Sequence, residues 1–67
     1  MITISKTENN RYDQSDIYTM LELKGLSTDT KPTKMGVFNI DNGSTFIEID
    51  TGKIYLYDLE NEEWKEI

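Results

Sequence analysis

Two turn sequences divide the second half of the chain into short apolar stretches. Asn42-Gly43 separates residues 37–40 from residues 45–49, and Asp50-Thr51-Gly52 separates residues 45–49 from residues 53–58. An Asn-Gly pair between two apolar stretches is typical of a tight β-hairpin. Three residues ending in glycine favour a turn whose last residue has positive φ. Because a polar turn then precedes a last short strand, the pattern predicts an antiparallel meander.

The first 14 residues carry a weaker signal. Ile2 and Ile4 alternate with polar residues, which indicates a short first strand, and the polar segment Thr7–Asn10 predicts a turn. Further along, residues 25–34 predict a structured loop, because Pro32 forces the residue before it into an extended conformation.

Residues 15–24 fit two structures. As a helix, the segment would begin at Ser15 as its N-cap and end before Gly25. As a strand, it would place Ile17, Thr19, Leu21 and Leu23 on one face. The strand separates apolar from polar residues better, so the sequence favours a strand over a helix here.

The predicted fold is a single small all-β domain over residues 1–67. It is an antiparallel β-meander of about four to five strands, with one short helix at 15–24 as the alternative. A chain of 67 residues buries only about 60% of the surface that its unfolded form exposes. It has no cysteine and no histidine, so neither disulfides nor a zinc site can supplement its core. We therefore expect it to associate with itself or with other proteins.

The two faces of the predicted meander differ. Alternation places Ile47 and Ile49 with Ile54 and Leu56, and we expect this aliphatic face to form the core. The other face is aromatic and acidic. It is a candidate interface, because Tyr and Trp are enriched at binding hot spots, although cross-strand pairing in a thin sheet is the alternative. The predicted interface residues are Phe46, Tyr55, Tyr57 and Trp64, with the acidic turn residues Glu60, Glu62 and Glu63.

Composition and charge exclude several classes of function. Without histidine and cysteine, the chain lacks the common nucleophile and base arrangements, so we expect no enzyme activity. Alignment on a calcium loop puts Phe38, Ile40 and Ile49 at ligand positions, and the glycines lack a phosphate-binding spacing, so we expect no metal or cofactor. No apolar stretch is long enough to span a membrane.

The net charge of −6 falls entirely within residues 35–67. Phosphate backbones require the opposite charge, so we expect no direct nucleic-acid binding. The acidic segment at residues 60–66 has two interpretations. It either imitates a phosphate backbone or forms a solvated edge whose like charges discourage aggregation between strands.

Two stretches of the chain resemble a known family. Residues 25–33, GLSTDTKPT, and residues 42–58, NGSTFIEIDTGKIYLYD, followed by Trp64, are similar to small acidic proteins encoded by tailed bacteriophages and prophages. The resemblance covers residues 25–67 and brings no catalytic residues. It implies a structural or decoration protein of the capsid or tail, made in the bacterial host cytoplasm and located in the virion. The implied partners are phage structural proteins or further copies of the chain. The alternative is a small acidic anti-defence protein that binds a host immune protein or a signalling nucleotide.

Overall fold

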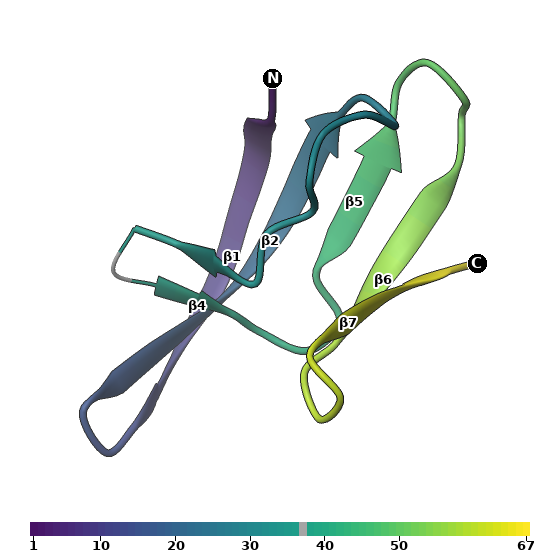
Figure 1. Ribbon diagram of the computed structural model, residues 1–67. Helices are drawn as coiled ribbons and strands as arrows, with labels where there is room; N and C mark the ends of the chain where they lie inside the picture. The colour runs from purple at the N-terminus through teal and green to yellow at the C-terminus, as the bar shows by residue number, and fades with distance from the viewer. Residues whose placement is uncertain (37) are drawn as a thin grey trace.

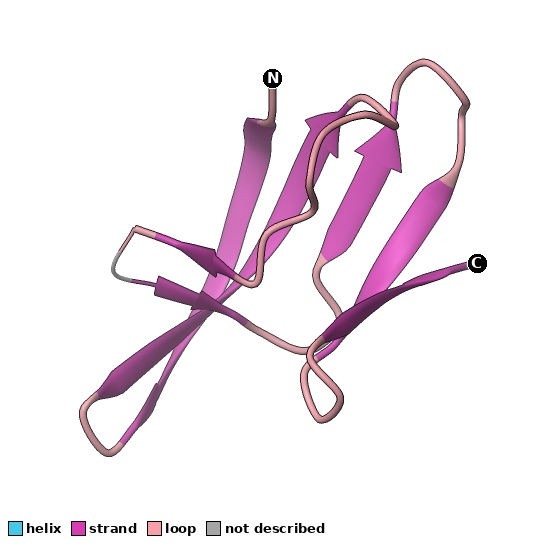
Figure 2. Ribbon diagram, in the orientation of Figure 1, coloured by secondary structure: helices cyan, strands magenta, loops and turns pink. Residues whose placement is uncertain are grey.

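The strands form one curled, mixed sheet, a half-barrel (Figure 1). The computed structural model describes residues 1–36 and 38–67, with only the backbone of Glu8 and Asn9. The described residues form seven strands and no helix (Figure 2). These are β1 (Thr3–Asp13), β2 (Asp16–Gly25), β3 (Lys34–Met35), β4 (Phe38–Ile40), β5 (Thr45–Glu48), β6 (Ile54–Asp58) and β7 (Glu63–Glu66). The all-β prediction is confirmed, whereas the predicted four to five strands are too few.

The first two strands form a long antiparallel hairpin whose turn contains Gln14 at a φ of 59°. The turn predicted at Thr7–Asn10 is therefore wrong. That segment belongs to β1, and its register against β2 shifts between Thr7 and Asn10. A polar segment here produces a bulge, which adds a residue to one strand without reversing the chain.

Residues 16–25 form the central strand of the sheet. β2 pairs with β1 along one edge and with both β4 and β5 along the other. Its buried residues alternate strictly from Thr19 through Leu21 and Leu23 to Gly25. This confirms the strand over the helix, because only a period of two puts these four residues on one face.

The segment around Asn42-Gly43 does not form the predicted hairpin. β4 and β5 both run parallel to β2 and do not pair with each other. The main chain keeps its direction because Asp41 N donates to Thr19 O (2.9 Å), and Gly43 N, at a φ of 87°, donates to Tyr57 O (3.0 Å). The loop thus lies between two strands that pair with the same edge of β2, and the chain does not reverse its direction there. The sheet is mixed for this reason, not a purely antiparallel meander. Val37, included in the predicted hairpin, lies outside the described residues.

The C-terminal part of the meander is as predicted. β5, β6 and β7 pair antiparallel in sequence order. Gly52, in the turn between β5 and β6, has a φ of 77°. The predicted positive φ is therefore confirmed.

The core lies on the face that the sequence analysis expected to be exposed. Phe46 and Tyr57 are buried with Leu21, Leu23 and Ile40. Residues 26–33 cross this inner face of the sheet (Figure 1). By contrast, Ile49, Ile54 and Leu56, expected to form the core, are 65%, 43% and 41% exposed. The expectation failed because alternation sorts residues into two sets without showing which set the loop covers.

Within the described parts of the chain, no helix is long and apolar enough to cross a membrane.

Candidate protein-docking surface

The predicted aromatic interface is inside the molecule. Phe46 is fully buried and Tyr57 is almost so, whereas Tyr55 and Trp64 are partly buried and pack against the core. The ring centroid of Trp64 lies 4.9 Å from that of Tyr57 and 5.9 Å from that of Phe46. Trp64 Nε1 donates to Pro32 O at 2.8 Å, which anchors residues 26–33 to the inner face. These aromatic side chains hold the fold together and do not form a free contact surface.

A partly buried ion pair anchors the same loop a second time. Lys31 Nζ donates to Glu48 Oε2 at 2.6 Å and lies 4.3 Å from the ring centroid of Tyr55 and 4.9 Å from that of Phe46. Thr51 Oγ1 donates to the other oxygen, Glu48 Oε1, at 2.6 Å. The Lys31 hydrogen bond, followed by that of Thr51, lowers the pKa of Glu48. A carboxylate can therefore occupy the inner face because both of its oxygens are satisfied.

The acidic residues predicted for the interface lie in the turn between β6 and β7 and at the start of β7. Glu60, Glu62 and Glu63 are exposed. Asp58 organises this turn, since its carboxylate accepts hydrogen bonds from Glu60 N and from Asn61 Nδ2. The Asn61 side-chain hydrogen bond is the main cause that lowers the pKa of Asp58. The turn is thus a local structure at one end of the sheet, between Tyr57 of β6 and Trp64 of β7.

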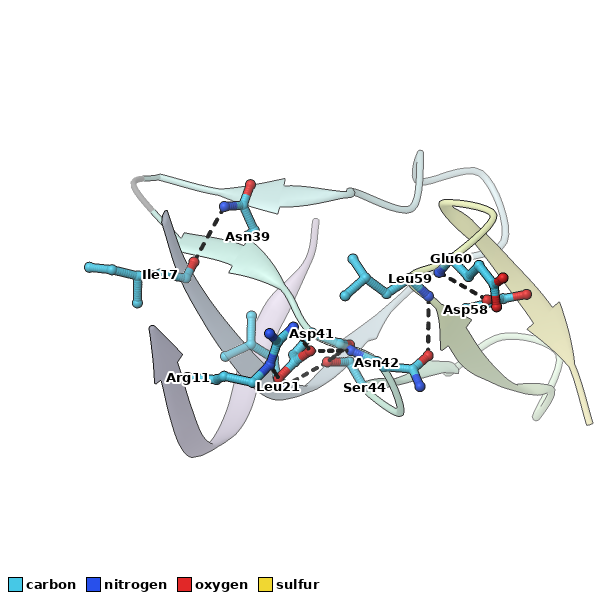
Figure 3. A network of polar contacts seen from close by, with 10 residues as sticks. All are labelled: Arg11, Ile17, Leu21, Asn39, Asp41, Asn42, Ser44, Asp58, Leu59 and Glu60. Carbon is cyan, nitrogen blue, oxygen red and sulfur yellow. Dashed lines mark hydrogen bonds and ion pairs between the residues drawn. The ribbon is translucent and has the colours of Figure 1, made fainter. Parts of the chain in front are cut away.

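Another polar network fixes the loop between β4 and β5 (Figure 3). Arg11 Nη2 donates to Asp41 Oδ1 at 3.0 Å, and this side-chain hydrogen bond is the main cause that lowers the pKa of Asp41. The loop also connects to the turn between β6 and β7, because Leu59 N donates to Asn42 Oδ1 at 3.1 Å. These contacts join parts of the chain that are distant in sequence. We assign them a structural role.

The outer face of the sheet carries an exposed group of aliphatic side chains. Strand pairing aligns Ile47 with Ile54 and Thr45 with Leu56. Ile49 continues the alternation of β5, and Ile67 N donates to Ile54 O beside them. We call this group the aliphatic patch; it consists of Ile47, Ile49, Ile54, Leu56 and Ile67. Ile47 is half-buried and the other four are exposed. Contiguous apolar groups of this kind mark interaction surfaces.

The charges around the aliphatic patch are balanced. Among the described side chains of the rows that contain or adjoin the patch, three lysines balance three carboxylates. They are Lys6, Lys24 and Lys65, and Glu22, Asp58 and Glu63. The whole chain carries −6, and these six residues contribute nothing to that negative excess. A second surface therefore meets no net charge from them.

An open hollow adjoins the patch on the outer face. It has a volume of about 290 Å³ and is lined by Lys6, Met20, Leu21, Glu22 and Thr45. It is open to solvent. Among the side chains that the structure describes, which do not include that of Glu8, no acidic cluster is suited to a metal ion. The hollow can receive an apolar side chain from a neighbouring surface.

Sequence reasoning identified the residues of the aliphatic patch but assigned them to the core. The signal that separates the two faces is Lys31, a lone cation in a loop that can neutralise Glu48 on the aromatic face. Comparison of the chain with protein-family models, curated proteins and solved structures gave no match. The resemblance to phage proteins consequently remains a prediction.

Proposed function

We propose that this chain is a non-enzymatic docking module, an accessory structural protein of a tailed-phage virion that attaches to its neighbours through the aliphatic patch. The single observation that carries the proposal is the exposure of Ile49, Ile54 and Leu56 on one side of the sheet. Covering apolar area contributes about 25 cal/mol of stabilisation per Å². A 67-residue chain has a small core, so covering the patch adds stabilisation that the isolated chain lacks. The virion as the location follows from the sequence resemblance.

The distribution of hydrogen bonds supports docking over imitation of nucleic acid. Asp41, Glu48 and Asp50 bind Arg11, Lys31 and Ser27, respectively, within the chain. A phosphate mimic needs rows of carboxylates that are free to meet a basic partner. Here these carboxylates organise loops, and the exposed acidic turn at residues 60–63 is short.

The test is incorporation into purified particles of the phage that encodes the chain, measured by mass spectrometry for the wild type and two variants. Ile54→Lys places a charge in the aliphatic patch, and Ile4→Lys is its matched control, because Ile4 pairs with Leu23 of the inner face. Ile54 is 43% exposed and Ile4 is 46% exposed, and both changes add one positive charge. We expect the wild type and Ile4→Lys in the particles and at least a tenfold loss of Ile54→Lys. Absence of the wild type from the particles overturns the virion role. Equal incorporation of both variants overturns docking through the patch.

A further inference from the structure

We infer that the occupant of the aliphatic patch is a second copy of this chain, related by a two-fold axis that runs along the strands between β5 and β6. This inference rests on the proposed docking function and names the partner. Strands β2, β5, β6 and β7 are consecutive neighbours in the sheet (Figure 1). A two-fold axis between the middle two lays β5 of one copy over β6 of the other, and β2 over β7. Such an interface is self-complementary, as symmetric dimers require.

The apolar residues match under this operation. Strand pairing puts Ile47 beside Ile54 and Thr45 beside Leu56, so the axis passes between the members of each pair. Ile47 of one copy then faces Ile54 of the other. Leu56 faces Thr45, which lines the 290 Å³ hollow on the outer face. The exposed Leu56 side chain of each copy therefore enters the hollow of the other.

The charges match as well. Glu22 on β2, Thr45 on β5, Leu56 on β6 and Lys65 on β7 lie in one row of paired residues. Since the axis exchanges β2 with β7, Glu22 of each copy meets Lys65 of the other. Lys65 Nζ also lies 3.7 Å from Asp58 Oδ2 and 3.5 Å from Glu63 Oε1 of its own chain and is half-exposed, so it can be shared with the partner copy. Two equivalent ion pairs then flank the apolar centre. Opposite charges at the two ends of one row give attraction only when the second copy is turned by this axis, so the charges also fix the orientation.

The test is sedimentation equilibrium of the purified chain from micromolar to millimolar concentration, with charge-reversal variants. Glu22→Lys and Lys65→Glu each create two like-charge contacts, whereas the double variant restores two attractive pairs in reversed order. Glu60→Lys and Lys34→Glu change exposed charges away from the patch and serve as controls. Circular dichroism confirms that each variant is folded before its association is compared.

We expect a species of twice the 7.8 kDa chain mass. Each single reversal should weaken self-association about tenfold, and the double variant should return to within about threefold of the wild type. Ile54→Lys should weaken it by roughly 100-fold, because the residue counts twice in a symmetric interface. A monomer at millimolar concentration, a dimer insensitive to Ile54→Lys, or a double variant as weak as the single variants would overturn the inference.

The two proposals fail in different ways. A monomeric chain that still enters particles, and loses this ability on Ile54→Lys, overturns the dimer and leaves docking through the patch intact. A dimer with the expected charge dependence that is absent from particles overturns the virion role alone.

Discussion

Replacement of Ser44 by alanine should destabilise the protein through one buried hydrogen bond. Ser44 is fully buried in the loop between β4 and β5. Its Oγ accepts from Leu21 N at 3.0 Å and donates to Asp41 O at 2.9 Å. The hydroxyl thus bonds the Leu21 N–H of β2 at a position where neither β4 nor β5 pairs with that strand. Ser44→Ala leaves the buried Leu21 N–H without its hydrogen-bond partner and removes the donor to Asp41 O.

An unpaired buried donor costs about 1–3 kcal/mol in the free energy of unfolding. We expect Ser44→Ala to lose about 2 kcal/mol within that range. Ser5→Ala is the matched control, because Ser5 Oγ also bonds a backbone group across the sheet, Glu22 O at 3.0 Å, but at an exposed position. Water can replace the lost hydroxyl there, so the expected change is within about 0.5 kcal/mol.

Urea unfolding followed by the fluorescence of Trp64 measures both variants, at one protein concentration because association would shift the apparent stability. Amide exchange adds a local readout, since Leu21 N–H should exchange faster in Ser44→Ala. Equal free energies of unfolding for Ser44→Ala and Ser5→Ala would refute the reasoning.

Three further outcomes are expected. Gly25→Ala should destabilise by about 1–3 kcal/mol in urea unfolding, since its Cβ would lie 2.8 Å from Phe46 Cζ in the core; wild-type stability would contradict this contact. Gly52→Val should cost about 1 kcal/mol or more in the same assay, because a β-branched residue resists the φ of 77° found there; an unchanged value would contradict the turn. The pKa values of Asp41, Glu48 and Asp58 are lowered in the folded state by hydrogen bonds from Arg11, Lys31 and Asn61, respectively. Their contribution is present above the ordinary values of 3.8 and 4.5 and is lost as the pH falls through the folded-state values, so the thermal midpoint should be flat near neutrality and fall below about pH 4. A flat midpoint down to about pH 3 would contradict these pairs.

The parts of the fold that the sequence predicts are those set by neighbouring residues. Asp50-Thr51-Gly52 specifies its turn by itself, and the hairpin of β5 and β6 follows from it. The alternation from Ile17 to Leu23 likewise specifies a strand. Asn42-Gly43 carries an equally strong local signal, yet Thr19 O and Tyr57 O, both far away in sequence, hold the loop in another course. Parallel pairing of β4 and β5 with β2 depends on these distant groups, so a local reading could not reveal it.

Polar groups, and not the amount of apolar area, determine which face of the sheet is buried. Both sets of alternating residues are apolar enough to be buried, but the aromatic set includes Glu48 and the Trp64 N–H, which need partners if covered. Residues 26–33 supply both, through Lys31 Nζ and Pro32 O. The aliphatic set has no group that would hold a loop in place by hydrogen bonds. A short loop can therefore be fixed on the aromatic face, whereas only another extended surface can cover the aliphatic one.

The same inversion determines where the negative charge lies. The carboxylates that fix loops, Asp29, Asp41, Glu48 and Asp50, accept hydrogen bonds from those loops and from Arg11 and Lys31. None of them lies in the rows of the aliphatic patch, where strand pairing leaves equal numbers of lysines and carboxylates. In the sequence, the patch residues and the whole net negative charge both lie within residues 35–67. Strand pairing places Lys24 beside Ile47, and Lys6 beside Glu22, which itself pairs with Thr45. The aliphatic patch is thus flanked by equal numbers of described lysines and carboxylates, which the charge of the sequence alone would not suggest.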